Sequence, residues 1–98
     1  MPRQSVNLEQ KLSMFKEHWS PKSVASFNDH DVMVVKVLGE FNWHKHDDTD
    51  DFFLVLSGAL TIRFRDEHVV LGPGERYEIP RGVDHCTSDR EEVHLLLI

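Results

Sequence analysis

A change in hydrophobic periodicity after residue 30 constrains the fold of this chain more than any other feature. From residue 31 onward, short runs of β-branched and aromatic residues are separated by turn residues such as glycine, proline and aspartate. In the run at residues 60–65, apolar and polar side chains alternate, as in a strand that buries one face. Many short, closely spaced strands predict a sandwich or barrel. We expect strands at residues 31–38, 40–45, 51–57, 60–65, 68–71, 76–79 and 93–97.

Three of these runs also indicate how the strands must pack. Residues 32–35, 52–56 and 95–98 are apolar at both odd and even positions, so both faces of those strands need cover. One short helix can hide only part of that surface. We therefore expect a homodimer packed through this sheet, and the alternative is a monomer whose fold closes over both faces.

The segment before the strands predicts one amphipathic helix at residues 7–19. Apolar residues recur on one helical face at intervals of four, three and four: Leu8, Leu12, Phe15 and Trp19. Asn7 followed by Gln10 resembles an N-terminal capping box, and Pro21 explains why the helix would stop.

Length and charge indicate a single globular domain. A chain of 98 residues is too short for two independent cores, so we expect one domain over residues 1–98, with its barrel at 31–98. Acidic residues outnumber basic ones by 17 to 11, which gives a net charge of −6. Because a polyanion would be repelled overall, we expect no nucleic-acid partner.

The sequence carries no feature of a membrane or secreted protein. No apolar run approaches the roughly 18 residues of a transmembrane helix, and residues 1–5 lead into a polar segment rather than a signal-peptide core. The single cysteine, Cys86, excludes an internal disulfide and suits a reducing compartment. We therefore expect a cytoplasmic protein with no membrane partner.

Two separated blocks hold candidate metal ligands. His44 and His46 are two residues apart in a segment expected to be extended, so their rings project from one face and can share an ion. The acidic residues that follow, among them Asp50 and Asp51, place a carboxylate within a turn's reach. Downstream, a proline-glycine turn delivers His85. His-x-His alone is a weak signal, and the second block strengthens it.

The first block resembles the first cupin motif, in which a glycine is followed by His-x-His, a glutamate and a second glycine. The matching residues are Gly39, His44, His46, Asp51 and Gly58. Asp51 takes the place of the glutamate, and Gly39 lies one residue closer to His44 than in the usual motif. Asp50 fits a shorter version of the spacing after His46, but it is separated from Gly58 by seven residues instead of six. We prefer Asp51 for this reason.

The second block resembles the second cupin motif, whose last position is commonly asparagine. The matching residues are Gly74, Pro80, Gly82, His85 and Asp89. The short stretch between the motifs, residues 59–73, is typical of small bacterial cupins. Over residues 31–98 the chain resembles the small single-domain bacterial cupins with a cupin-2 conserved barrel, labelled mannose-6-phosphate isomerase-like. That resemblance implies an all-β cupin double-stranded β-helix, or jelly-roll barrel, with a short N-terminal α-helix.

The same resemblance implies a divalent metal centre whose ligands are His44, His46, Asp51 and His85. Three neutral imidazoles and one carboxylate suit Fe, Mn, Co, Ni, Cu or Zn, and the sequence does not choose among them. Four protein ligands leave one or two coordination positions open to water or a small-molecule ligand. Since aspartate is one methylene shorter than glutamate, incomplete metal occupancy is an alternative.

Strand parity predicts the surroundings of this centre. Phe53 and Val55 share the parity of the expected carboxylate ligand and would line a largely apolar pocket. Phe41 and Trp43 alternate with His44, so they are expected to face away from the metal.

Three functions fit these residues, because a fold does not decide function. The one we favour is a metal-dependent enzyme that acts on a small molecule at an open site in the barrel. The others are a non-catalytic small-molecule-binding or sensor module, and a structural cupin with a degenerate metal site. The sequence shows no separate general base: Cys86 is expected to be an inert packed thiol, and Arg81 a solvated turn residue.

Overall fold

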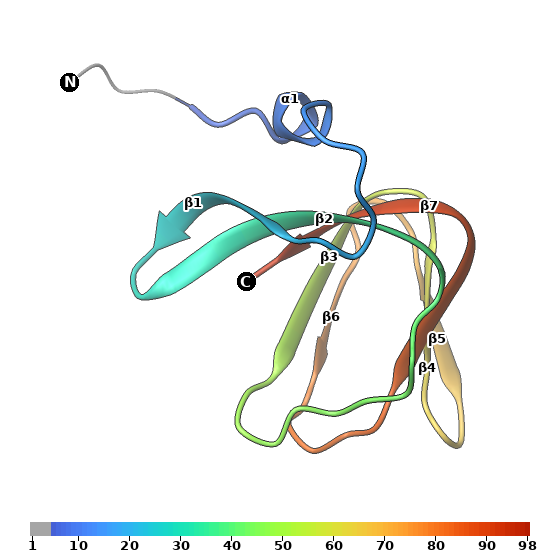
Figure 1. Cartoon of the computed structure of the whole chain (residues 1–98). Coiled ribbons are helices and arrows are strands. Elements are labelled where there is room, and N and C mark those ends of the chain that lie inside the picture. The colour runs from blue at the N-terminus through green and yellow to red at the C-terminus, as the bar shows by residue number, and fades with distance from the viewer. Residues whose placement is uncertain (1–4) are drawn as a thin grey trace.

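A computed structural model describes residues 5–98 of the protein, so the first four residues of the predicted single domain lie outside the described residues. The described part has one short helix and seven strands (Figure 1). In chain order these are α1 (Leu8–Leu12), β1 (Lys22–Phe27), β2 (His30–Glu40), β3 (Asp51–Ser57), β4 (Leu60–Arg63), β5 (His68–Leu71), β6 (Arg76–Ile79) and β7 (Cys86–Leu97). The predicted all-β fold with a short N-terminal helix is confirmed.

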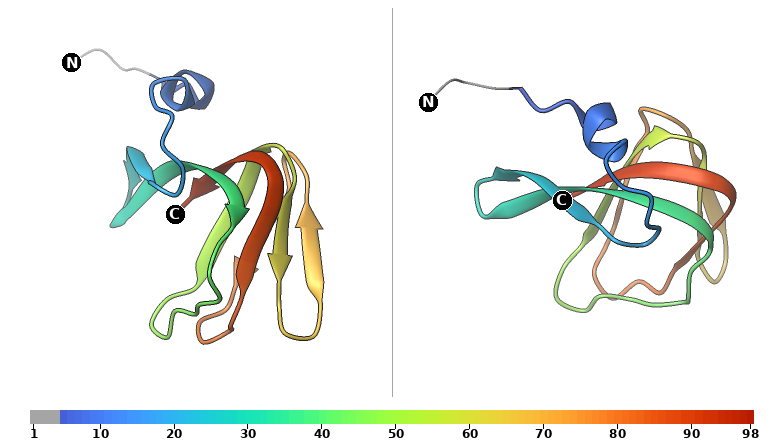
Figure 2. Two further views of the ribbon diagram at one scale, coloured as in Figure 1. Left: turned by 45° about the vertical axis from the view of Figure 1, so that its right-hand side comes forward. Right: turned by 45° about the horizontal axis from the view of Figure 1, so that its top comes forward.

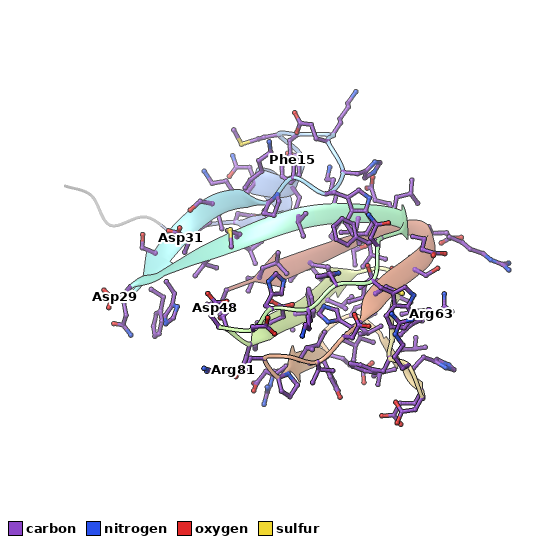
Figure 3. The ribbon with its side chains drawn as sticks, turned by 60° about the horizontal axis from the view of Figure 1, so that its bottom comes forward. Phe15, Asp29, Asp31, Asp48, Arg63 and Arg81 are labelled. Atoms are coloured by element: carbon purple, nitrogen blue, oxygen red, sulfur yellow. The ribbon has the colours of Figure 1, made fainter. Side chains whose placement is uncertain are left out.

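The strands form an antiparallel sheet that curls round one core (Figures 1 and 2). Its main path runs β1-β2-β7-β3-β6, and β4 joins β7 to β5. The long strand β7 organises the fold because β2 pairs with it from Ser88 to Leu97, β3 pairs with its C-terminal end, and β4 pairs with its N-terminal end. Charged side chains such as Asp31 and Arg63 lie on the outside of the molecule (Figure 3).

The chain turns a sharp corner between β3 and β4 at Gly58. The two strands do not pair with each other among the described residues, and both lie along β7. Gly58 has φ of +86°, and a Cβ atom there would lie 2.9 Å from the backbone oxygen of Glu92. A residue without a side chain is needed here for both reasons, the left-handed backbone and the close approach of β7.

The interior of the barrel is built from the alternating apolar positions of the strands. Val55 pairs with Leu95, and Val35 pairs with Leu95 from the other side, so the three strands contribute neighbouring side chains to one layer. Leu60 and Ile62 of β4 are fully buried in the same cluster. Burial of each such side chain stabilises the fold by about 1.5–3 kcal/mol.

The helix is shorter than its sequence pattern predicts. It starts as expected, because Asn7 Oδ1 accepts a hydrogen bond from the Gln10 backbone N–H at 3.0 Å, but it ends at Leu12 and not at Trp19. The Ser13 hydroxyl donates to the Gln10 carbonyl at 2.6 Å, a local bond that competes with continued helix. Trp19 instead donates its backbone N–H to the Lys36 carbonyl of β2 at 2.8 Å.

The strands also differ from the expectation: β2 and β4 by one or two residues at their ends, and three others by more. The predicted strand at 40–45 is wrong: β2 ends at Glu40, and the following segment has only an isolated bridge at His44. Strand β1 is absent from the expected set because its sequence is short, serine-rich and mostly exposed. Strand β7 begins at Cys86, seven residues before the predicted start, since its first half is polar.

The only helix among the described residues is too short to cross a membrane. Within residues 5–98, α1 has five residues, and no helix there is long and apolar enough to span a bilayer. The cytoplasmic location and the lack of a nucleic-acid partner stay predictions.

Candidate metal centre

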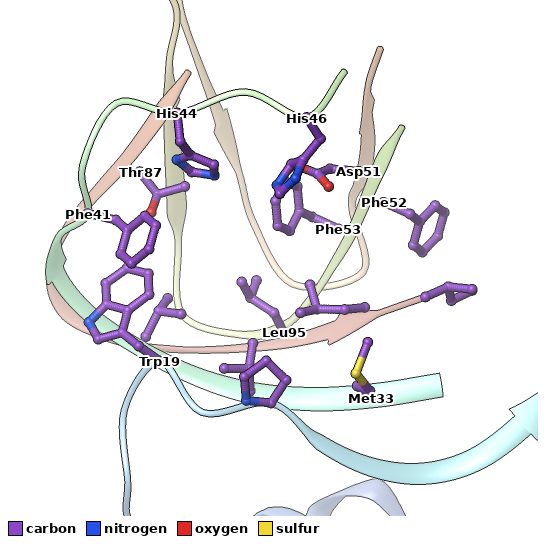
Figure 4. A pocket seen from close by; sticks show the side chains of 15 residues that line it. Trp19, Met33, Phe41, His44, His46, Asp51, Phe52, Phe53, Thr87 and Leu95 are labelled. Carbon is purple, nitrogen blue, oxygen red and sulfur yellow. The ribbon is translucent and has the colours of Figure 1, made fainter. Parts of the chain in front are cut away.

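Backbone hydrogen bonds bring the two histidine blocks together. The His44 N–H donates to the His85 carbonyl at 2.9 Å, and the His85 N–H donates to the His44 carbonyl at the same distance. The two imidazole rings therefore lie side by side, with centroids 4.3 Å apart. Asp51 begins strand β3 on the adjoining wall and points toward the same place (Figure 4).

Three of the four predicted ligands form one compact cluster. One candidate ligand atom from each of His44, Asp51 and His85 lies within 4.8 Å of the other two. Asp51 Oδ2 is 3.4 Å from Nε2 of His85 and 3.4 Å from Nε2 of His46. The set of donors is two imidazole nitrogens and one carboxylate oxygen, which suits a divalent transition-metal ion.

His46 occupies a different position from the other three predicted ligands. Its ring lies 5.4 Å from that of His44, centroid to centroid, and its side chain is 46% exposed. It adjoins Asp51 at the outer edge of the cluster and is not part of the set of three. The structure therefore places His46 beside the cluster, on its solvent side, and its role as a metal ligand stays a prediction.

The choice between the two aspartates has a structural answer. Asp50 Oδ1 accepts a hydrogen bond from the Arg81 backbone N–H at 2.8 Å, which directs Asp50 away from the cluster. Asp51 lies within the cluster despite its shorter side chain, because it is the first residue of β3 and that strand runs along the cavity wall. Arg81 is exposed, as predicted for a turn residue.

Local hydrogen bonds set the tautomers of the His44 and His85 imidazoles. The His44 Nδ1–H donates to the Asn42 carbonyl at 2.8 Å, and the His85 Nδ1–H donates to the Val83 carbonyl at 3.0 Å. Each ring in its neutral form therefore keeps a free lone pair on Nε2, which is the form that ligates metals.

His85 provides the direct test of whether these residues fit a metal ion. It is 1% exposed, and its Nε2 has no hydrogen-bond partner among the described residues. A buried polar atom without a partner costs about 1–3 kcal/mol, and an ion bound at the cluster would satisfy it. The residues present fit a divalent cation.

The protonation of His85 reflects the same surroundings. Burial lowers its pKa because it disfavours the imidazolium, but the Asp51 carboxylate and the Val83 carbonyl act in the opposite direction and leave the pKa raised above its usual value. Since a metal binds the neutral imidazole, binding at this cluster competes with protons.

A cavity of about 400 Å³ opens beside the cluster (Figure 4). His44, His46 and Asp51 form one end of it, and apolar side chains form most of the rest. Phe53 lines the cavity as predicted. Val55 does not, because its side chain is fully buried in the core.

Sequence reasoning missed the aromatic side of this cavity. Phe41 was expected to face away from His44, but it lines the cavity and meets the His44 ring edge-on at 5.1 Å. The parity argument failed because the segment after β2 is not a strand. Trp19, which the helical pattern placed on a helix face, stacks on Phe41 at 4.8 Å. No local signal connects residues 19 and 41.

A small antiparallel β-barrel with two imidazoles and a carboxylate gathered at its open end is the architecture of a cupin. The Cupin_2 family, described as a cupin domain, matches residues 31–98. The chain belongs to this family. Membership confirms the predicted fold, while the finer likeness to mannose-6-phosphate isomerase-like proteins stays a prediction.

Individual relatives agree with this assignment. A cupin-2 domain containing protein from Shewanella frigidimarina superposes with a TM-score of 0.91 at 46% identity, covering 94% of this chain and 90% of its own. Protein NMB1881 from Neisseria meningitidis has a TM-score of 0.83 at 28% identity, covering 96% of both chains. Protein YdbB of Bacillus subtilis is 41% identical over 73 residues, which span 74% of this chain and 65% of that relative.

Proposed function

We propose that this cupin is a metal-dependent protein that binds a divalent transition-metal ion through His44, Asp51 and His85, with His46 as a fourth ligand. The observation that carries the proposal is the buried, unpaired Nε2 of His85, which lies 3.4 Å from the Asp51 carboxylate. In the neutral ring this nitrogen and the Asp51 oxygen are both acceptors, so they do not pair, and burying the nitrogen without a partner destabilises the fold.

We further propose that the bound ion makes the protein an enzyme for a small molecule held in the adjoining cavity. The ion would supply Lewis-acid or redox chemistry at its open coordination positions. The protein's own residues fix the imidazole tautomers, place one carboxylate and surround the reacting group with apolar walls that limit access of water.

One observation supports a non-catalytic alternative. The titratable residues that line the cavity within the described part of the chain are His44, His46 and Asp51, which are the proposed ligands themselves. No separate general base is left for proton transfer, so the candidate reactions are those that need none. A binding or sensor module, which needs no base at all, is therefore the second candidate.

Metal stoichiometry of the whole, untagged chain tests the proposal. We expect about one ion per chain after reconstitution with cobalt or zinc, and a loss of affinity on the order of 100-fold in His85→Ala. His68→Ala, at an exposed histidine of β5, is the matched control and should bind normally. Because removing buried His85 could impair folding, His44→Ala at a half-buried position provides a second variant. Full metal content in both variants would refute the ligand assignment.

We also propose a homodimer packed through the outer face of the sheet. Leu54 and Leu96 are neighbours across β3 and β7 and are only half-buried, and Phe27 at the end of β1 is 64% exposed. A second copy would cover these side chains. Light scattering at micromolar concentration should give twice the chain mass, and a monomer there would contradict the proposal.

A further inference from the structure

The cavity beside the metal cluster has two chemically different ends. Its polar side chains, His44, His46, Asp51 and Thr87, gather where the candidate ligands lie. Apolar residues make up the remainder, and Figure 4 shows Met33 and Leu95 on the wall opposite the histidines. A ligand that fills the cavity therefore needs one polar end and one apolar body.

The charges around the cavity restrict the ligand further. No lysine or arginine is among the described residues that line it. Two cations from neighbouring segments are engaged elsewhere: Lys36 Nζ donates to the Phe15 carbonyl at 2.7 Å, and Arg81 is exposed beside Asp50. A phosphate group in the apolar part would lose its hydration without gaining a cation, which is strongly unfavourable. Phosphorylated sugars are therefore poor ligands for this site.

An aromatic wall, made of Trp19 and Phe41, connects the apolar part of the cavity to the metal cluster. The two rings stack at 4.8 Å with an interplanar angle of 27°, and Phe41 meets His44 edge-on at 5.1 Å. Rings in this arrangement offer a flat surface next to the candidate metal position. An aromatic ligand ring that packs against such a surface gains more than the burial of its apolar area alone.

The backbone holds this wall in place at some cost. Trp19 has φ of +61°, a left-handed conformation that is unfavourable for a bulky residue. Two hydrogen bonds to β2 keep it there: the backbone N–H donates to Lys36 O at 2.8 Å, and the indole Nε1–H donates to Leu38 O at 3.2 Å. Because one bond fixes the backbone and the other fixes the indole ring, the ring is set in the cavity before any ligand arrives.

We propose that the natural ligand is a small aromatic molecule with a single oxygen-donor head group, and not a sugar or a sugar phosphate. The head group would bind at the metal cluster and the ring would lie against the aromatic wall. This inference rests on the proposed metal site, which it deepens by naming the class of ligand. The cavity volume of about 400 Å³ lies within the range usual for small-molecule sites.

Two hydroxamates with the same chelating head group test the proposal on the cobalt-loaded whole chain. Benzohydroxamate carries a phenyl ring, whereas acetohydroxamate carries a methyl group, and visible absorption of the cobalt reports the binding of either. We expect benzohydroxamate to bind roughly tenfold more tightly or better, because its ring removes more apolar surface from water. We expect mannose 6-phosphate to show no saturable binding at millimolar concentration.

Two matched variants locate the origin of this preference. Trp19→Leu should reduce the phenyl preference to roughly two- to threefold while leaving acetohydroxamate binding unchanged. Trp43→Leu is the control, since Trp43 lies under the Arg65 guanidinium at 3.8 Å and does not line the cavity. Equal affinities for the two hydroxamates, or tighter binding of mannose 6-phosphate, would overturn the proposal.

A measurement on metal-free protein separates this inference from the metal proposal. Toluene should shift the NMR signal of the Trp19 indole N–H and leave that of Trp43 in place. If cobalt does not bind but toluene shifts Trp19, the metal proposal fails and the aromatic site stands. If cobalt binds and neither phenyl preference nor toluene shift is seen, the aromatic site fails alone, as it would if a second copy of the chain covered the cavity.

Discussion

Asp89 is predicted to destabilise this protein at neutral pH, and Asp89→Asn should therefore stabilise it. The residue is 8% exposed on β7, at the position where the second cupin motif commonly has asparagine. Oδ1 accepts a hydrogen bond from the Thr61 backbone N–H at 2.9 Å, whereas Oδ2 is buried without a partner in the described part of the chain. Burial raises the pKa of Asp89, and the Thr61 hydrogen bond offsets this only in part.

The expected gain in the free energy of unfolding depends on which interactions the asparagine amide keeps and which unfavourable ones it removes. Asparagine retains an oxygen for the Thr61 N–H and removes the buried charge, but its NH₂ group would occupy the site of the unpaired Oδ2. An unsatisfied buried group costs about 1–3 kcal/mol, and more when it is charged. The difference leaves a net stabilisation of about 1 kcal/mol at pH 7. For a domain of this length, that corresponds to an increase in Tm of about 4–8 °C.

The pH dependence distinguishes this mechanism from a general packing effect. The folded-state pKa of Asp89 lies above its unfolded value, so the folded protein binds the proton more tightly, and stability falls as pH rises between the two values. The advantage of Asp89→Asn should therefore be absent below the unfolded pKa and complete above the folded pKa. Urea unfolding from pH 3 to pH 7 measures it, with Glu91→Gln on the same strand as an exposed control. An equal gain at pH 3 and pH 7, or a loss at pH 7, would refute the reasoning.

Two further predictions concern the corner of the barrel and the metal. Gly58→Ala should lower the free energy of unfolding by more than about 2 kcal/mol, because it combines a left-handed φ with a contact of 2.9 Å to Glu92 O. Gly74 has φ of +83° but open space around it, so Gly74→Ala should lower the free energy of unfolding, measured with denaturant, by only about 1 kcal/mol. Zinc at about 100 times its Kd should raise the free energy of unfolding by about 2.7 kcal/mol, and excess chelator should remove this gain without unfolding the chain. Loss of the circular dichroism signal in the chelated protein would contradict a preformed site.

The strands that the sequence predicts best are those bracketed by turn residues. Strands β3, β5 and β6 have their predicted bounds because their alternating or apolar runs end at glycine, proline or aspartate. The segment at 40–45 is predicted to be a strand because its apolar and polar residues also alternate. It is held instead by hydrogen bonds to distant residues, such as Phe41 N–H to Thr87 O, and these leave no trace in local periodicity.

The candidate site, too, has one part that the sequence predicts and one part that it does not. Three of the four predicted ligands, His44, Asp51 and His85, lie in one cluster. The sequence points to them because two histidines two residues apart, a nearby acid and a third histidine after a proline-glycine turn are unusual together. The cavity wall does not follow, since Trp19 reaches it only through a left-handed backbone and hydrogen bonds to β2. The helical pattern over residues 7–19 placed Trp19 on the wrong element, because the helix ends at Leu12, where the Ser13 hydroxyl donates to the Gln10 carbonyl.

His44 and His85 make the same kind of local hydrogen bond, which explains how the site can be ordered before it binds metal. In each, Nδ1–H donates to the carbonyl two residues earlier, Asn42 for His44 and Val83 for His85. Each ring is thus oriented by its own segment, and the reciprocal backbone bonds between residues 44 and 85 then align the two segments. Since neither step requires the ion, the fold itself bears the cost of gathering the ligands. That cost is visible as the unpaired Nε2 of His85, the atom that an ion would satisfy.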